Sequence, residues 1–138
     1  MKKEILTTIQ SCKALQGKTV EELIATDRFH DNLAAYMTAQ REDRKQIRAS
    51  YAAMRKVGGA KGYKLPAHPI DRVIDLSVDD FAAEFMAVIA KVSKRPYAER
   101  RYIQQLGQQA YNLTVAQYVV EEYPELESVL IPKPKNAN

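Results

Sequence analysis

The stretch Ser77–Arg95, SVDDFAAEFMAVIAKVSKR, decides the fold because it is the most apolar periodic segment and carries helix signals at both ends. Ser77 is followed three residues later by Asp80, a spacing in which the serine hydroxyl accepts a hydrogen bond from an amide at the helix start. Pro96 prevents a smooth continuation beyond Arg95. The pattern therefore predicts a helix over residues 78–93.

The apolar side chains of this helix cover a broad face. At ~100° per residue they fall within an arc of roughly 160°, wider than the stripe of a half-exposed helix. We therefore expect a mostly buried central helix, in which burying Phe81, Phe85 or Ile89 contributes ~1.5–3 kcal/mol each. The positions concerned are Val78, Phe81, Ala82, Phe85, Met86, Val88, Ile89 and Val92.

Length and composition indicate one globular domain. The chain has 138 residues, of which 46% are hydrophobic and 28% charged, so wholesale disorder is excluded. No window approaches 18 apolar residues, and no apolar run follows the basic start Met1–Glu4, so neither a membrane span nor a signal peptide is expected. The single cysteine, Cys12, excludes an internal disulfide and suits a reducing compartment, which predicts the cytoplasm. It falls on an apolar helix face, so we expect a buried thiol.

The segments before the central helix also have helical patterns. Residues 2–16 predict a first helix that stops at Gly17, and Thr19–Glu22 forms a capping box that opens a short second helix. One apolar phase then persists over residues 28–56, which predicts a single helix ~43 Å long. The alternative is two helices broken near Arg41–Arg44. Residues 58–75 are predicted to form a long Gly/Pro-containing loop, in which Gly58, Gly59 and Gly62 end the helix.

After the central helix, Pro96 suits the first turn of another helix. Thr114–Gln117 has the spacing of a second capping box, so the chain is expected to turn at Asn112–Leu113 and restart. The final helix should end before Pro124. The sequence thus predicts an all-α fold, a single-domain bundle of five or six helices over residues 1–123, followed by a partly disordered C-terminal tail over 124–138.

Charge is unevenly distributed, although the net charge is only +4. Residues 41–72 hold nine Lys or Arg and three Asp or Glu, whereas residues 73–131 hold five and nine. Such polarity concerns partners rather than the fold.

The basic segment gives the leading functional hypothesis. Its helical cations lie within roughly 120° of one another, and glycines let backbone amides approach an anion. Tyr63 offers a ring for stacking on a base. We therefore predict contact with the phosphates of DNA or RNA, against the alternative of a merely solvated or protein-binding face. The candidate residues are Arg41, Arg44, Lys45, Arg48, Arg55, Lys56, Lys61, Tyr63 and Lys64.

A second pattern has helix-turn-helix-like spacing around Ala110–Val120. The segment that would read DNA carries Glu121 and Glu122 and has no Lys or Arg, and its carboxylates would repel phosphates. We therefore expect an ordinary helical corner here.

Catalytic and metal sites have no support in the sequence. His30 and His68 lack the spacing of metal ligands, and no serine lies in a nucleophile motif. We expect no enzyme activity, no cofactor and no small-molecule substrate. The competing hypothesis is a structural or adaptor protein, acting by protein–protein interaction or homo-oligomerisation, in which residues 41–64 of one copy meet acidic residues 79–84 or 121–127 of another. Eight tyrosines, five of them in the C-terminal third, suit such a surface, although half-buried core tyrosines are the favoured interpretation.

Overall fold

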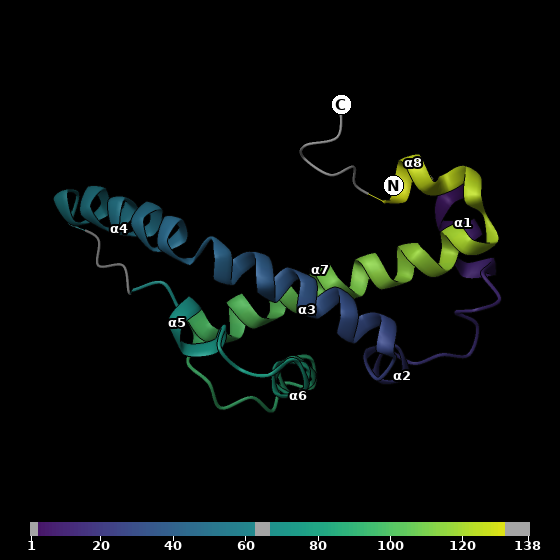
Figure 1. Cartoon of the computed structure of the whole chain (residues 1–138), viewed down its shortest axis with the longest axis horizontal. Helices are drawn as coiled ribbons and strands as arrows, with labels where there is room; N and C mark the ends of the chain where they lie inside the picture. Colours follow the sequence, from purple (N-terminus) through teal and green to yellow (C-terminus); the bar gives the residue numbers. More distant parts are fainter. Residues whose placement is uncertain (1–2, 63–66, 132–138) are drawn as a thin grey trace. The chain divides into compact units, whose positions relative to one another are not determined.

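A computed structural model describes residues 3–62 and 67–131 of the chain. These residues form α-helices and one short 3-10 helix, with no strand among them, so the predicted all-α class is confirmed. In chain order the elements are α1 (Lys3–Ser11), α2 (Val20–Ile24), α3 (Asp27–Glu42), α4 (Arg44–Ala60), α5 (Ile70–Val73), α6 (Val78–Ile89), α7 (Tyr97–Glu122), η1 (Pro124–Leu126) and α8 (Glu127–Leu130) (Figure 1).

Contacts between Cα atoms divide the chain into two compact units. The first comprises Met1–Asn32 and Gln109–Asn138, and the second comprises Leu33–Gln108. α3 and α7 contribute residues to both units, whereas α4, α5 and α6 belong to the second. The single domain expected over residues 1–123 and the bundle around one central helix stay predictions.

α6 supplies two phenylalanines to the core of the second unit. Phe81 and Phe85 are both fully buried, which confirms the predicted inner face of this helix. A Cβ atom added to Gly107 of α7 would lie 2.3 Å from Cδ1 of Phe85, so only glycine lets the ring come this close to the α7 backbone. The other buried apolar side chains of this unit are Leu33, Met37, Ile70, Val73, Ile74, Ala82, Tyr102, Ile103 and Leu106.

Two predicted helix starts are confirmed. The Ser77 hydroxyl accepts a hydrogen bond of 3.1 Å from the Asp80 backbone N–H at the start of α6. Thr19 and Glu22 form the complete capping box before α2, because each side chain accepts from the other residue's backbone N–H. These hydrogen bonds satisfy amides that lack a partner within the helix.

The predicted end of α6 is wrong. Lys91 has a φ of 61°, so the chain leaves the helix before residue 93. The Val92 N–H donates to the Ala87 carbonyl at 2.9 Å and the Lys91 N–H donates to the Val88 carbonyl at 3.1 Å, a Schellman motif. Glycine usually occupies this left-handed position, so a lysine there gives no signal in the sequence.

Burial along α6 is also narrower than predicted. Ile89 is 40% exposed, which contradicts its predicted place in the core. Just beyond the helix, Arg95 forms ion pairs with Glu84 at 3.0 Å and Glu99 at 2.9 Å. Arg95 therefore links Glu84 of α6 to Glu99 of α7.

The single helix predicted over residues 28–56 is wrong, and the alternative break near Arg41–Arg44 is present. Asp43, between α3 and α4, has φ −92° and ψ 5°, in the bridge region. Backbone hydrogen bonds nevertheless continue across it, from Asp43 N–H to the Ala39 carbonyl and from Ile47 N–H to the Asp43 carbonyl. Because this ladder continues, the apolar phase is not reset and the pattern does not reveal the break.

The predicted loop over residues 58–75 is shorter in the structure. Gly58 and Gly59 lie inside α4, so the prediction that they end the helix is wrong; Gly62, with φ 89°, marks its end. A glycine inside a helix costs ~0.5–1 kcal/mol relative to alanine, and the helix tolerates it. Further along, Ile70, Val73 and the following Ile74 are buried, so α5 is anchored by apolar burial.

α7 is one continuous helix, so the turn predicted at Asn112–Leu113 and the helical corner are both wrong. Thr114 is buried and its hydroxyl donates to the Ala110 carbonyl at 2.7 Å, a hydrogen bond to the preceding turn rather than a cap. The Pro96 carbonyl accepts from the Arg100 N–H at 3.0 Å, and α7 ends before Pro124 as predicted.

In the first unit, α1 ends at Ser11, so the helix predicted over residues 2–16 is too long. Cys12 is fully buried, as predicted. Part of the predicted tail is helical, in η1 and α8, and residues 132–138 lie outside the described residues. The other buried apolar side chains of this unit are Leu23, Ile24, Phe29, Ala110, Ala116 and Val119.

We predict opposite effects of two Gly→Ala substitutions in helices. Gly107→Ala should lower the free energy of unfolding by about 1–3 kcal/mol, because the new methyl group collides with the Phe85 ring. Gly59→Ala should raise it by up to ~1 kcal/mol, since nothing lies within 4 Å of its added Cβ and alanine favours the helix. Urea denaturation of both variants checks this, and equal effects would contradict the packing described for Phe85.

Candidate nucleic-acid interface

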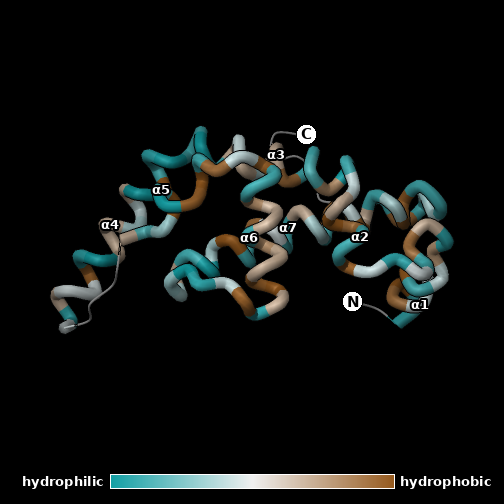
Figure 2. Tube along the Cα trace, turned by 90° about the horizontal axis from the view of Figure 1, so that it is seen from below, coloured by the Kyte–Doolittle hydropathy of each residue, from teal (hydrophilic) through white to brown (hydrophobic). Residues whose placement is uncertain are grey.

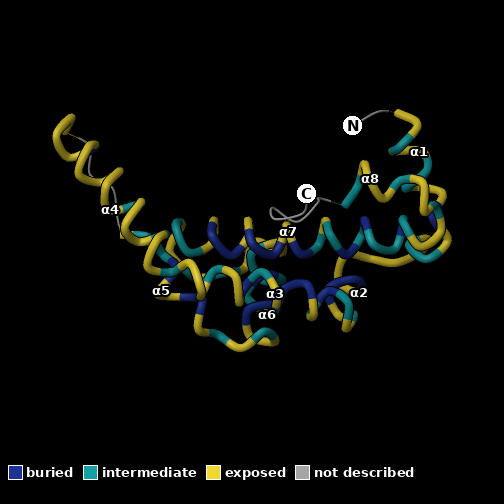
Figure 3. The backbone as a smooth tube through the Cα atoms, turned by 45° about the horizontal axis from the view of Figure 1, so that its top comes forward, coloured by how far each residue is buried: buried dark blue, intermediate teal, exposed yellow. Residues whose placement is uncertain are grey.

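α4 carries most of the predicted contact residues. From Arg44 to Lys61 the sequence has six Lys or Arg and no Asp or Glu. Figure 3 shows α4 as exposed along most of its length, and Figure 2 shows hydrophilic residues (teal) interspersed with paler and apolar ones along it. The helix therefore presents a strongly positive surface.

The cations and the apolar side chains of α4 lie on separate faces. At ~100° per residue the five helical cations from Arg44 to Lys56 share an arc of about 120°. The apolar residues Ile47, Tyr51, Met54 and Val57 share a second arc of about 120° that does not overlap the first. Met54 and Val57 are each 58% exposed, so this second face is only partly covered.

Arg41 is exposed, but its guanidinium is hydrogen-bonded to backbone carbonyls of the same chain. Its Nε donates to the Ile74 carbonyl at 3.0 Å and its Nη2 donates to the Leu76 carbonyl at 3.2 Å. Both carbonyls lie just after the short helix α5. Arg41 therefore fastens this part of the chain to the end of α3.

Arg44 and Arg48 are paired with carboxylates of the same segment. Arg44 Nη2 lies 2.6 Å from Asp75 Oδ1, and this hydrogen bond raises the pKa of the Arg44 guanidinium. Arg44 Nε lies 3.6 Å from Asp71 Oδ1, an ion-pair distance too long for a hydrogen bond. Arg48 Nη1 lies 3.4 Å from Asp71 Oδ2. Asp71 and Asp75 thus partly neutralise this end of the predicted site.

The remaining predicted residues divide into two groups. Lys45, Arg55, Lys56 and Lys61 are exposed, whereas Tyr63 and Lys64 lie outside the described residues. The cations of α4 thus share one face by helical period, and Arg41, Arg44 and Arg48 have intramolecular partners that the sequence did not indicate.

His68 lies in a small pocket beside α4. The pocket has a volume of about 220 Å³, and its lining includes Arg48, Tyr51, Arg55 and Asp71. The His68 ring packs edge-to-face against Tyr51, with ring centroids 5.1 Å apart.

Two contacts hold the His68 ring from the other side. It packs edge-to-face against Tyr102 of α7 at 5.3 Å, and its Nδ1 accepts a hydrogen bond of 3.0 Å from the Ile70 N–H. Burial lowers the pKa of the imidazole, and the nearby Asp71 carboxylate opposes that shift. The Tyr102 hydroxyl in turn donates to Gln40 Oε1 at 2.7 Å, which explains why Gln40 interrupts the apolar stripe of α3.

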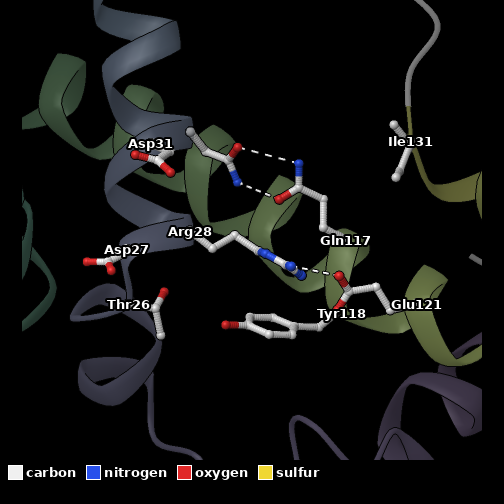
Figure 4. Close-up of a pocket in the computed structure, with 9 residues that line it drawn as sticks. Thr26, Asp27, Arg28, Asp31, Gln117, Tyr118, Glu121 and Ile131 are labelled. Carbon is white, nitrogen blue, oxygen red and sulfur yellow. Dashed lines mark hydrogen bonds and ion pairs between the residues drawn. The ribbon is translucent and has the colours of Figure 1, made fainter.

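A larger pocket lies in the first unit, with a volume of about 690 Å³ (Figure 4). On one wall Asn32 Nδ2 donates to Gln117 Oε1 at 2.9 Å and to Thr114 Oγ1 at 3.0 Å. On another, Arg28 Nη2 donates to Glu121 Oε2 at 2.7 Å, which raises the pKa of Arg28 and lowers that of Glu121.

Tyr118 also lines this pocket, and its ring lies against the guanidinium of Arg28. The Arg28 Cζ atom lies 4.4 Å from the centroid of the Tyr118 ring, a cation–π contact. Lys18 Nζ lies 5.0 Å from the same centroid. Among the polar side chains of this pocket, Asn32 pairs with Gln117 and Arg28 pairs with Glu121, so these residues form a structural junction of α3 and α7. Nη1 of Arg28 is buried and has no hydrogen-bond partner among the described residues.

Sequence reasoning missed this junction, although a signal exists. Arg28 and Asn32 are four residues apart, as are Gln117 and Glu121, and the first pair meets the second in reverse order. Matching polar pairs at this spacing indicate two antiparallel helices. Here the pattern was obscured because Thr114–Gln117 also fits a capping box.

Other predicted features lie as follows. The Cys12 thiol donates to the Tyr118 carbonyl at 3.7 Å, and burial raises the pKa of this thiol. Of the C-terminal tyrosines, Tyr97 is 64% exposed and Tyr102 is buried, while the other three are partly buried. Among residues 3–62 and 67–131, no three His, Cys, Asp or Glu side chains gather in a way that could hold a metal ion.

Comparisons with known proteins identify no relative. No protein-family model matches the chain, and no curated protein or solved structure shows significant similarity to it. In the described part of the chain, no helix is both long enough and apolar enough to cross a membrane.

We predict that His68 makes stability fall on mild acidification. The pKa of His68 is lower in the folded protein than in the unfolded chain, so the unfolded chain binds the proton first as the pH falls. The free energy of unfolding should therefore decrease below about pH 6.5, by at most ~1.4 kcal/mol per pH unit.

Urea denaturation between about pH 7.5 and 5.5 measures this effect, in a range where histidine is the side chain that ordinarily titrates. His68→Asn, whose amide oxygen can replace Nδ1 as acceptor, should reduce the dependence. His30→Asn is the control and should retain it. Equal pH dependence in the wild type and His68→Asn would contradict the assignment.

Proposed function

We propose that the protein is a non-catalytic binding protein that contacts nucleic-acid phosphates through the cations of α4. The observation that carries this proposal is the exposed segment from Lys45 of α4 to Lys61, just after the helix, whose charged side chains are all cationic. Phosphate contacts supply most of the affinity in non-specific nucleic-acid binding, and lysine and arginine make them. The single cysteine favours a reducing compartment such as the cytoplasm.

The length of α4 suits a row of phosphates. Its 17 residues span about 25 Å at 1.5 Å per residue, and duplex DNA carries one negative charge per ~1.7 Å of its axis. A row of cations along one helix face can therefore lie against several phosphates at once. No feature of α4 distinguishes one base from another, so the proposed contact is to the backbone of DNA or RNA.

Fewer residues are proposed to contact phosphate than the basic residues that the sequence suggested. Arg41 and Arg44 are engaged by Ile74, Leu76 and Asp75, so we assign them to the fold rather than to the ligand. Charge reversal of Arg44 would disturb the anchoring of α5 as well as any binding. Lys45 and Lys56 are exposed members of the cationic face and make cleaner test positions.

We predict salt-dependent binding to generic nucleic acid. Fluorescence anisotropy with duplex and single-stranded DNA, between about 25 and 200 mM salt, should give a log–log slope of several, since each duplex phosphate contact contributes about −0.9. Lys45→Glu with Lys56→Glu should weaken binding at least tenfold and reduce the slope by about two.

The control for this double variant is Lys13→Glu with Lys94→Glu, which makes the same change in net charge at exposed positions outside α4. It should weaken binding much less. A flat salt dependence, no binding at low salt, or equal losses in the two double variants would sink the proposal.

A second candidate function rests on the other face of α4. Met54 and Val57 are each 58% exposed, and phosphate binding does not explain exposed apolar side chains. An adaptor role, in which α4 meets an acidic and partly apolar protein surface or a second copy of this chain, uses both faces. The acidic residues 79–84 or 121–127 of a second copy are the proposed counterpart.

We predict for this candidate that the mass measured by light scattering rises with protein concentration. Met54→Gln with Val57→Gln should abolish the rise, because the change removes apolar area from the contact. Val92→Gln with Val129→Gln replaces two other exposed valines and should leave the rise intact. A constant monomer mass at high concentration removes self-association.

A further inference from the structure

We propose that the pocket beside α4 that contains His68 seats one phosphate group of the bound nucleic acid. The inference rests on the proposed function and adds a defined subsite to it. Three features of the pocket support it: its size, its two arginines and the fixed imidazole. A fourth group, the Asp71 carboxylate, competes with the ligand and gives the inference a test.

The pocket has the size of a single phosphate rather than of a large metabolite. Its volume is about 220 Å³, below the ~300–1,000 Å³ of pockets for drug-sized ligands. Ala52 and Ala67 belong to its lining, and their small side chains leave room between the larger ones. A phosphate with part of its sugar fits this space, whereas a dinucleotide does not.

Two arginines of α4 line the pocket. Arg48 and Arg55 are seven residues apart, so they lie about 20° apart around the helix and about 10 Å apart along it. Long guanidinium side chains two turns apart can converge on an anion between them. Arginine binds phosphate in a bidentate manner, with directional hydrogen bonds that a solvated lysine lacks.

His68 adds a donor whose geometry is fixed. Because Nδ1 accepts from the Ile70 N–H, the neutral ring carries its proton on Nε2, which is then available as a donor. The edge-to-face contacts with Tyr51 and Tyr102 restrict rotation of the ring. The charged and titratable groups around it are Arg48 and Arg55 of α4, Tyr51 of α4, Asp71 of α5 and Tyr102 of α7.

Asp71 competes with an anionic ligand. Its Oδ2 lies 3.4 Å from Arg48 Nη1, so a phosphate must share or displace this ion pair. A free phosphate should therefore bind weakly, and a phosphate in a polymer held by the lysines of α4 should bind well. Asp75 pairs with Arg44 at 2.6 Å and does not line the pocket, so it provides a matched control.

The test uses NMR titration of the full chain with inorganic phosphate and with uridine monophosphate. The chain has two histidines, so His68→Asn assigns the ring signals and His30 serves as an internal reference. Both probes should shift the His68 signals and leave those of His30 unchanged.

Asp71→Asn should strengthen phosphate binding about fivefold, the equivalent of ~1 kcal/mol for removing a like charge near 4 Å in water. Asp75→Asn should change it less than twofold, and Arg55→Gln should abolish the shift.

A second arm separates this inference from the proposed function. Fluorescence anisotropy measures the affinity of the Asp71→Asn and Asp75→Asn variants for the DNA oligonucleotide of the salt titration. A larger gain in affinity for Asp71→Asn supports a seated phosphate. Oligonucleotide binding without any His68 response, or with equal gains in the two variants, overturns the pocket and leaves the function of α4 standing. A His68 response to free phosphate without oligonucleotide binding upholds the phosphate pocket and overturns its assignment to nucleic acid.

Discussion

The attachment of residues 70–76 to the junction of α3 and α4 is the constraint on which the candidate site depends. α5 has only four residues, too few to be stable as an isolated helix. It is held by burial of Ile70, Val73 and Ile74 on one side and by the hydrogen bonds from Arg41 to two backbone carbonyls on the other. Charge-assisted hydrogen bonds of this kind satisfy carbonyls that no helix satisfies.

This attachment divides the cations of the basic segment by role. Arg41 and Arg44 stabilise the position of α5, and Arg48 pairs with Asp71 in the lining of the pocket that contains His68. Lys45, Arg55 and Lys56 are exposed, and α4 itself contains no Asp or Glu. The pocket that contains His68 adjoins this cationic face, because Arg48 and Arg55 of α4 line it.

The features predicted correctly are those that depend on residues close together in the sequence. The caps at Ser77 and Thr19, and the burial of Phe81 and Phe85, follow from spacing within one helix, and all are confirmed. The break at Asp43 was only an alternative, since its hydrogen-bond ladder keeps the apolar phase. The pairing of Arg44 with Asp75 could not be predicted, because no periodicity connects these two residues. Thr114 shows the opposite failure. It has a valid capping spacing but lies inside α7, where its hydroxyl donates to the Ala110 carbonyl of the preceding turn and accepts from Asn32 of α3.

The amino-acid composition of the exposed part of α4 explains why this segment is stable as a helix. Between Arg48 and Val57 every residue except Tyr51 is exposed, so packing contributes little to its stability. The residues there include Ala49, Ala52 and Ala53 with Met, Arg and Lys, all strong helix formers, and their propensity compensates for the missing burial. A helix stabilised by propensity keeps its surface available, whereas one stabilised by packing covers it. The composition of α4 is therefore what a helix needs when its side chains serve a partner rather than the core of its own chain.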